Sequence, residues 1–400
     1  MGFDWELVQS LLDRFSVGSD QTVLDPFCGA GTTLVQCKKQ GITSIGIDAN
    51  PVCVLASLVK TNWRLDPDAL TTSLKRVLDA AGAIERRGAT DEDPALQYLK
   101  GSGMIGRGWI SLHKARKVIA LGAAIKKTVH KPPEHRFFQL ALISALVNRI
   151  ADIKFGPEVY CLSEPRRFAV NSSFTRHAEK MIDDLTQIAG QKRANASTRV
   201  FLGDSRRDEA LRGAAPKGVD FVITSPPYPN EHDYTRNSRL ELVILGYVRM
   251  AVDLQPLKQS MVRCNTKGLY KNHADDERYS ARYLAVRRIA RTLDRRAIKH
   301  TDRFSKLYGQ MVREYFGGMV RHLRSAMRTL RPGGRCAYVV RDQQSLLGLY
   351  VDTPKILAGI ATSHSQGFRL DDIIEWKKAR GSTGVRTLSE KILIFRKSSR

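Results

Sequence analysis

The sequence predicts an α/β protein with a seven-stranded, mostly parallel sheet and an antiparallel hairpin at one edge. Short apolar or β-branched runs recur along the chain with helical patterns between them, which is typical of parallel strands buried on both faces. The last two runs are separated only by a Gly-rich, polar stretch, which favours a hairpin. The seven expected strands cover residues 21–25, 44–48, 199–204, 220–225, 335–342, 370–379 and 391–397.

Two segments interrupt the alternation of strands and helices. Roughly 150 residues separate the second expected strand from the third, whereas a crossover connection needs about 12 or more. The second segment, residues 231–310, carries 17 Lys and Arg against 9 Asp and Glu, a local excess of +8. Helical spacing in the first segment predicts helices over 69–87, 111–129, 134–150 and 174–188, with Pro132-Pro133 and Gly156-Pro157 as breaks.

The overall charge indicates a polyanionic partner. The 400-residue chain has a formal net charge of +25, spread along its length, which favours nucleic acid over a membrane surface. Its six cysteines form no CxxC pair, so neither a zinc knuckle nor a disulfide framework is expected. No leader pattern opens the chain, and its most apolar stretch, residues 137–150, is too short to cross a bilayer. A reducing cytosol fits these features.

A Gly-x-Gly turn lies between the first expected strand and the helix that follows it. Gly29 and Gly31 let the backbone approach a ligand closely, and the helix that begins near Thr32 directs its amide dipoles at the turn. Asp48 ends the next strand, where a carboxylate can accept two ribose hydroxyls. Asp204 follows the third strand, where it could accept from an adenine amino group. The competing interpretation of both aspartates is a helix cap.

Taken together, the motifs resemble the amino-directed DNA methyltransferases that use S-adenosylmethionine. That resemblance implies a Rossmann-like class I methyltransferase fold, with S-adenosylmethionine as cofactor. It covers roughly residues 5–60, 197–237 and 315–397. The stretches that carry it are DPFCGAGTT from Asp25, GIDANP from Gly46, TSPPY from Thr224 and LRPGGRCAYVVRD from Leu330.

Within this resemblance, SPPY is the catalytic tetrapeptide. An exocyclic amino group is a poor nucleophile because its lone pair is delocalised into the ring. The Ser225 side chain and the Pro226 carbonyl would each accept one of its N–H bonds and so localise that lone pair. Pro226 and Pro227 restrict the backbone and keep the carbonyl aimed at the site. Tyr228 would offer a ring face to a base swung out of the duplex, and the competing interpretation is a packed core aromatic.

The resemblance also assigns residues around the cofactor loop. Phe27 is expected to lie against the methionine portion of the cofactor and Asp25 to accept its ammonium group. Strand-end packing is the competing interpretation of Phe27. A carbon-5 methyltransferase is disfavoured because it needs a cysteine nucleophile where this chain has Pro226-Pro227. The family usually has a cofactor-binding motif before the first helix. In this chain, either that motif is abbreviated around Phe3 to Trp5 or the methionine end of the cofactor is bound differently.

The expected catalytic domain comprises residues 1–60, 197–234 and 311–400, interrupted by a helical insertion at 61–196 and a basic insertion at 235–310. Only three residues follow the last expected strand, so target recognition is expected from the insertions. In the basic insertion, cations interleaved with tyrosines suit DNA binding, and a solvated helix face is the competing interpretation. The expected contacts are Arg236, Arg239, Arg287, Arg288, Arg295 and Arg296, with Lys and Arg at 114, 116, 117, 126 and 127 as a rival basic face.

The expected activity is methylation of the cytosine N4 amino group in duplex DNA, by direct displacement without metal. Serine at the first tetrapeptide position is associated more often with cytosine in this family, and aspartate with adenine. The alternatives are adenine N6 methylation, amino methylation of RNA and a non-catalytic DNA-recognition subunit. Double-stranded DNA and a paired restriction endonuclease or other defence-system protein are the expected partners. The expected location is the cytoplasm, in association with the nucleoid when the protein is bound to DNA.

Overall fold

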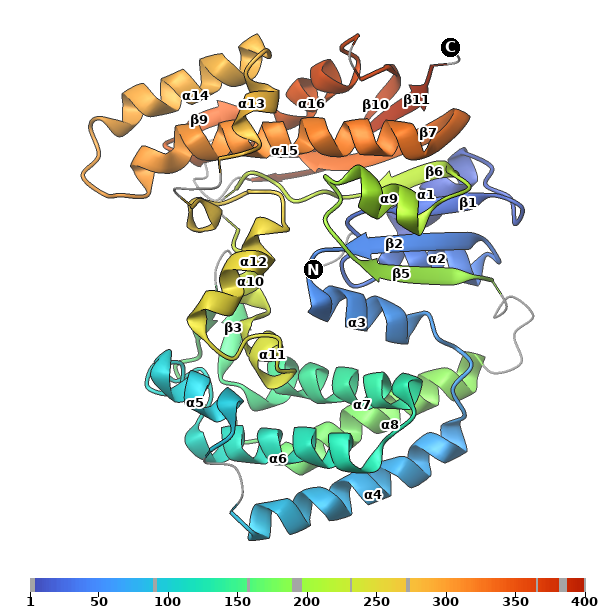
Figure 1. The fold of residues 1–400 in the computed structure, drawn as a ribbon, viewed down its shortest axis with the longest axis vertical. Coiled ribbons are helices and arrows are strands. Elements are labelled where there is room, and N and C mark those ends of the chain that lie inside the picture. Colours follow the sequence, from blue (N-terminus) through green and yellow to red (C-terminus); the bar gives the residue numbers. More distant parts are fainter. Residues whose placement is uncertain are drawn as a thin grey trace. The chain divides into compact units, whose positions relative to one another are not determined.

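The computed structural model describes residues 4–88, 92–156, 159–188, 196–230, 232–270, 274–364, 366–380 and 387–398 (Figure 1). The chain divides into two compact units. Unit 1 comprises Met1–Ser57, Asn195–Asp233 and Lys258–Arg400, and unit 2 comprises Leu58–Ala194 and Tyr234–Leu257. The segment expected as one basic insertion is therefore shared, because its first part packs with unit 2 and the part from Lys258 onward with unit 1.

Unit 1 contains all seven strands that the sequence predicts. Their order in the sheet is β10-β11-β7-β6-β1-β2-β5. Strands β5, β2, β1, β6 and β7 run parallel, and β11 runs antiparallel to both β7 and β10. The predicted α/β class and edge hairpin are confirmed. The strands are β1 Thr22–Asp25, β2 Thr43–Asp48, β5 Thr198–Leu202, β6 Val219–Thr224, β7 Leu330–Arg341, β10 Phe368–Arg380 and β11 Thr387–Lys397.

The strand order creates a switch point between β1 and β6. The chain places β2 and β5 on one side of β1 and then returns to lay β6 on the other side. Val23 pairs with Phe221 and Leu24 with Val222, so the carboxyl ends of β1 and β6 lie side by side. In open α/β sheets, ligands bind in the crevice at such a point. This end of the sheet is where the predicted motifs belong.

Helices cover both faces of the sheet of unit 1 (Figure 1). Asp4 caps α1, whose apolar residues at 7, 8, 11 and 12 share one helix face and pack against the sheet with Phe15. Phe15 stacks on Phe221 with ring centroids 5.5 Å apart. The remaining elements of unit 1 are α1 Trp5–Arg14, α2 Thr32–Lys39, α9 Asp208–Ala214, α13 Glu277–Ser280, α14 Leu284–Ala297, α15 Tyr308–Thr329, α16 Thr353–Ala361, the 3-10 turns Thr266–Gly268 and Ser305–Leu307, and the short pair β8 Gln343–Leu346 and β9 Leu349–Val351.

Strand β5 departs from the expectation of burial on both faces. It forms one edge of the sheet, and Phe201 and Leu202 are 37% and 61% exposed. The apolar pattern of this run therefore overstated its burial. The expectation is correct for β1, β2 and β6, where most residues are buried.

A buried cluster of charges ties the segment after Lys258 to α15. The fully buried Asp276 carboxylate accepts from Arg206 Nη1 at 2.5 Å, Arg263 Nη1 at 3.0 Å and Arg321 Nη1 at 2.6 Å. The backbone at Asp276 lies so close to α15 that a Cβ atom at Gly317 of this helix would be 1.9 Å from the Asp276 carbonyl oxygen. Glycine is therefore required on this helix face.

Unit 2 is mainly helical. Three of the four predicted helices are confirmed as α4, α6 and α8, and the fourth ends early because residues 146–150 form a π-helical turn. The hairpin of β3 and β4 was not predicted, since strands of three residues show no usable period. The elements are α4 Pro67–Arg86, α5 Pro94–Gly101, α6 Leu112–Thr128, α7 Pro132–Ala145, β3 Ile153–Phe155, β4 Val159–Cys161, α8 Val170–Ile188, α10 Tyr234–Asn237, α11 Arg239–Ile244 and the 3-10 turn Ala251–Asp253.

Two further helices cross the boundary between the units along the chain: α3 covers Pro51–Lys60 and α12 covers Leu254–Gln259. Among the helices within the described ranges, none has the length and apolarity that a membrane span needs.

Candidate active site

The Gly-x-Gly turn joins β1 to α2 and has a backbone shape that favours glycine. Gly29 and Gly31 have φ angles of 51° and 84°, in the left-handed region. A Cβ atom at Gly31 would lie 2.8 Å from Ser57 Oγ. The Gly29 N–H donates to Asp48 Oδ2 at 2.8 Å, and the Gly29 carbonyl accepts from Ser57 Oγ at 2.9 Å. The turn is thus tied to Asp48 of β2 and to Ser57 of the following helix.

Asp48 lies at the carboxyl end of β2, as predicted. Besides the Gly29 bond, its Oδ1 accepts from the Asn50 N–H at 2.8 Å, just before α3. The Asp48 carboxylate therefore makes a contact of the helix-cap type, which was the competing interpretation of this residue. Each oxygen retains acceptor capacity, because a carboxylate offers about four lone-pair sites. Burial raises the pKa of Asp48 to about 6.

Asp25 connects the carboxyl ends of β1 and β6. Its carboxylate accepts from Thr224 Oγ1 at 2.6 Å, from Thr33 Oγ1 at 2.6 Å and from the Phe27 N–H at 3.1 Å. The residue is 1% exposed, and burial raises its pKa to about 6. Asp25 thereby holds the start of the TSPPY segment beside the glycine turn. Its predicted contact with a cofactor ammonium group stays a prediction.

Phe27 packs against a histidine that sequence reasoning missed. The rings of Phe27 and His322 have centroids 4.7 Å apart. His322 of α15 is fully buried and its pKa is lowered to about 4 by burial. Its Nδ1 lies 3.0 Å from the Ser205 carbonyl, which only accepts, so Nδ1 carries the proton and Nε2 accepts from the Tyr338 hydroxyl at 2.8 Å. This packing fixes one side of Phe27.

Asp204 lies just beyond β5 and is paired with an arginine. Its Oδ1 accepts from Arg206 Nε at 2.9 Å and its Oδ2 from Arg206 Nη2 at 2.8 Å, a two-pronged ion pair. Oδ1 also accepts from the Arg206 N–H at 2.9 Å, which is the turn-type contact of the alternative interpretation. The predicted contact of Asp204 with adenine stays a prediction, and Arg206 was not anticipated.

The tetrapeptide follows β6 directly and is anchored by its own carbonyls. The Pro227 carbonyl accepts from the Tyr315 hydroxyl at 3.0 Å, and the Pro229 carbonyl accepts from Gln343 Nε2. Within the described ranges, no donor is found for the Pro226 carbonyl. The Ser225 hydroxyl lies 3.1 Å from the Tyr228 hydroxyl. The loop therefore has the Pro226 carbonyl and the Ser225 hydroxyl as candidate acceptors, while the carbonyls of Pro227, Tyr228 and Pro229 are held.

Tyr228 is half-buried and its hydroxyl is engaged. The hydroxyl donates to Glu390 Oε1 of β11 at 2.9 Å. Burial, together with the neighbouring Glu390 carboxylate, raises the pKa of Tyr228, so the phenol keeps its proton. The side chain is neither a fully packed core aromatic nor a free one.

Comparisons with known proteins show similarity to DNA methyltransferases. A family model described as DNA methylase matches residues 3–57, which include the glycine turn and Asp48. The Type II methyltransferase M.BsoBI of Geobacillus stearothermophilus is 24% identical, over 96% of this chain and 80% of that protein. The Type II methyltransferase M.AvaI of Nostoc sp. is 23% identical, over 99% of this chain and 84% of that protein.

These similarities support the amino-directed DNA methyltransferase family for this chain. Among solved structures, the rRNA methyltransferase aviRa from Streptomyces viridochromogenes is similar with a TM-score of 0.34 and 11% identity, over 99% of this chain and 86% of that chain. That family implies a methyl donor of the S-adenosylmethionine type.

Unit 1 has an exposed basic surface on α14. Its apolar residues, Val286, Ala290, Leu293 and Ala297, are buried on the side that packs against α15. The other side presents exposed arginines, of which Arg296 donates to the Leu347 carbonyl at 2.9 Å. The predicted contacts on this side are Arg287, Arg288, Arg295 and Arg296.

Two other predicted DNA contacts lie in unit 2 and are half-buried. Arg236 Nη2 is 3.5 Å from the Val159 carbonyl. Arg239 Nη1 is 3.4 Å from the Tyr98 hydroxyl. These guanidinium groups therefore interact within unit 2, and their contact with DNA stays a prediction.

The rival basic face on α6 is smaller than the sequence suggested. Lys114 forms a nearly buried ion pair with Asp152 at 2.8 Å, and Lys117 lies 3.7 Å from Glu85. Arg116, Lys126 and Lys127 are exposed. Three of the five cations named from the sequence thus face solvent.

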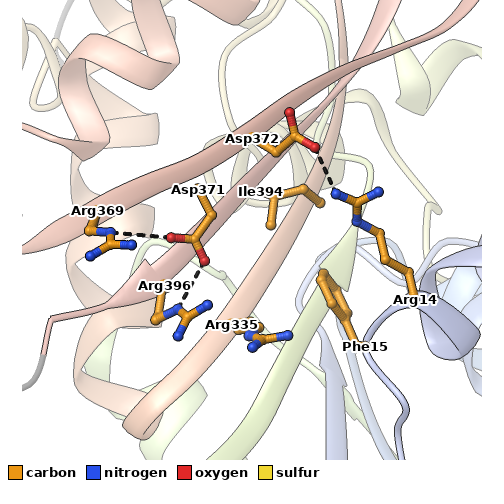
Figure 2. A pocket seen from close by; sticks show the side chains of 8 residues that line it. All are labelled: Arg14, Phe15, Arg335, Arg369, Asp371, Asp372, Ile394 and Arg396. Carbon is orange, nitrogen blue, oxygen red and sulfur yellow. Dashed lines mark hydrogen bonds and ion pairs between the residues drawn. The ribbon is translucent and has the colours of Figure 1, made fainter.

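Figure 2 shows a pocket of about 480 Å³ elsewhere in unit 1, beside the C-terminal end of α1. Its charges are partly paired, because Arg14 contacts Asp372 at 2.7 Å and Arg396 contacts Asp371 at 2.9 Å. None of its lining residues belongs to the predicted site. The lining residues are Arg14, Phe15, Arg335, Arg369, Asp371, Asp372, Ile394 and Arg396.

Proposed function

We propose that the protein methylates the N4 amino group of cytosine in double-stranded DNA, with S-adenosylmethionine as the methyl donor. The observation that carries the proposal is the 2.6 Å hydrogen bond from Thr224 to Asp25. It places the tetrapeptide that begins with Ser225 beside the glycine turn, at the switch point of the sheet, where ligands of such folds bind.

The donor set around the turn fits the cofactor. The left-handed glycines and the first turn of α2 offer close backbone approach, and Asp48 retains lone pairs that ribose hydroxyls would use. Phe27 would lie against the methionine portion, and Asp25 and Asp204 are the further carboxylates of the site. When bound, S-adenosylmethionine supplies a methyl group activated by a positively charged sulfur.

The tetrapeptide's part of the reaction is to hold and activate the target amino group. The Ser225 hydroxyl oxygen and the Pro226 carbonyl accept its two N–H bonds, which localises the nitrogen lone pair. Because Tyr315 holds the next carbonyl at 3.0 Å, these acceptors are in place before the base arrives. A base in a duplex cannot reach them while stacked, so the base must be extruded. Tyr228 would offer its ring face to the extruded base.

Ser225 supports cytosine as the target. In the amino-directed family, serine at this position accompanies cytosine more often than adenine, for which aspartate is commoner. Nucleoside mass spectrometry of DNA methylated by the purified protein tests the assignment. N4-methylcytosine is the expected product. N6-methyladenine as the sole product would overturn the choice of base and leave the amino-methyltransfer mechanism intact.

The proposed biological setting follows the curated relatives, which are Type II methyltransferases. We infer that the protein modifies DNA in the cytoplasm and is paired with a restriction endonuclease or another defence-system protein.

Asp48→Ala is expected to weaken cofactor binding. The carboxylate accepts from the Gly29 N–H and would accept from the ribose. Loss of hydrogen bonds to a charged group corresponds to about 1.5–3 kcal/mol of binding free energy. Titration calorimetry with S-adenosylmethionine measures the change. Unchanged affinity in a folded variant would remove Asp48 from the site.

Neutralising Arg287, Arg288, Arg295 and Arg296 together is expected to weaken DNA binding and flatten its salt dependence. If each contacts a phosphate, the slope of log affinity against log salt concentration falls by roughly 3–4 units. Fluorescence anisotropy with a labelled duplex at several salt concentrations measures it. The matched control neutralises Arg116, Lys126 and Lys127 of α6. A larger slope change in that control would assign recognition to unit 2.

A further inference from the structure

Glu390 is far from the tetrapeptide in sequence but contacts it in the fold. The Tyr228 hydroxyl lies between two partners, with Glu390 Oε1 at 2.9 Å on one side and Ser225 Oγ at 3.1 Å on the other. The backbone of Glu390 is fixed because β11 pairs with β7, where Arg341 is its register partner. The three side chains thus form a chain of hydrogen bonds that ends at the catalytic serine.

The chemistry of the three groups gives this chain a direction. A carboxylate only accepts, and a phenol has one proton to donate. The Tyr228 proton therefore points to Glu390, and the Tyr228 oxygen is left to accept from the Ser225 hydroxyl. The Ser225 proton then points to Tyr228 and away from the target base. Both lone pairs of the Ser225 oxygen are then available to the N–H bonds of an amino group.

We propose that Glu390 is a positioning residue, which acts through Tyr228 to keep the Ser225 hydroxyl oriented as an acceptor of the target amino group. The inference rests on the proposed function, since it concerns the same reaction. Without Glu390, the Tyr228 proton can turn to Ser225, and the Ser225 proton then faces the N–H bonds of the base. The Val339 carbonyl, 3.5 Å from the Tyr228 hydroxyl, is too distant to replace the carboxylate.

A double-mutant cycle tests the proposal. Glu390→Gln, Tyr228→Phe and the double variant are compared with the wild type by single-turnover methyl transfer to duplex DNA. We expect each single variant to lower the rate about 10- to 100-fold, as for the loss of a hydrogen bond to a charged group. We expect the double variant to be no slower than Tyr228→Phe, because Glu390 acts only through the phenol. Affinities for DNA and cofactor should be unchanged.

The matched control is Glu375→Gln on the neighbouring strand β10. Glu375 accepts from Ser389 Oγ at 3.0 Å and is not in the chain to Ser225, so this variant should turn over at the wild-type rate. Wild-type rates for Glu390→Gln would overturn the proposal, as would equal slowing by Glu390→Gln in the wild-type and Tyr228→Phe backgrounds. Tyr228→Phe removes a single atom and gives an independent test if Glu390→Gln does not fold, because a wild-type rate overturns the proposal as well.

The Ser225→Ala variant tests the proposed function separately from the positioning role of Glu390, so that failure of one can be distinguished from failure of the other. If Ser225→Ala is inactive but Glu390 and Tyr228 are uncoupled, only the positioning role is wrong. If Ser225→Ala is fully active, the activation mechanism itself is wrong, whatever the cycle shows.

Discussion

Ser225→Ala is expected to lower the rate of methyl transfer about 10²–10³-fold, as for the loss of one preorganised hydrogen-bonding group from an active site. The substitution removes the hydroxyl that would accept from the target amino group. It leaves the Pro226 carbonyl and the anchoring bond from Tyr315 to Pro227 in place. Cofactor and DNA affinities should therefore be retained, and the defect should be in kcat rather than in binding.

Single-turnover assays with saturating cofactor and DNA separate an effect on the rate of methyl transfer from an effect on binding. Ser172→Ala on α8 is the matched control, because Ser172 is exposed and bonds only to the local Ala169 carbonyl. It should have the wild-type rate. A folded Ser225→Ala protein with an undiminished rate would exclude the serine from the reaction.

Asp276→Ala is expected to produce the largest loss of stability. The carboxylate is fully buried and accepts from Arg206, Arg263 and Arg321. Removing one partner of a buried ion pair leaves the remaining charges uncompensated, at about 3–5 kcal/mol. Arg206 and Arg263 retain other carboxylates, Asp204 and Glu314, so the protein should still fold in the absence of denaturant.

Chemical denaturation followed by circular dichroism measures the free energy of unfolding. Asp294→Ala is the matched control, since Asp294 is 44% exposed and pairs with Arg313 on the surface. An exposed pair of this kind contributes about 0–1 kcal/mol. A loss for Asp276→Ala no larger than that of the control would show that the buried cluster does not stabilise the fold.

Much of the fold was predictable because its signals are local. Each strand of the sheet is a short apolar run, and TSPPY directly follows one of them. The carboxyl ends of parallel strands meet at one edge, so the sequence could predict that Ser225 and the glycine turn belong to one site. The structure confirms the seven strands, and it shows Thr224 Oγ1 2.6 Å from Asp25 Oδ1.

Partners that come from distant elements could not be predicted. Glu390 and Tyr228 are 162 positions apart, and their contact depends on the register of β11 against β7. His322 lies among other buried residues of α15, where nothing in the local pattern distinguishes it from packing. The Asp204 carboxylate was expected to be available to a ligand. The sequence does not distinguish its partner, Arg206, from the many other arginines of this basic chain. Pairing of side chains is decided by packing across elements, which spacing does not encode.

The position of β11 has a consequence for how the methyltransferase is made. This strand is the last in chain order, yet it lies second in the sheet, between β7 and β10. Proteins are synthesised from the N-terminus at about 5–20 residues per second, so β7 and β10 are both made before the strand that pairs with each of them. The nascent protein must wait with an unpaired strand edge, and its tetrapeptide lacks Glu390 until β11 is in place.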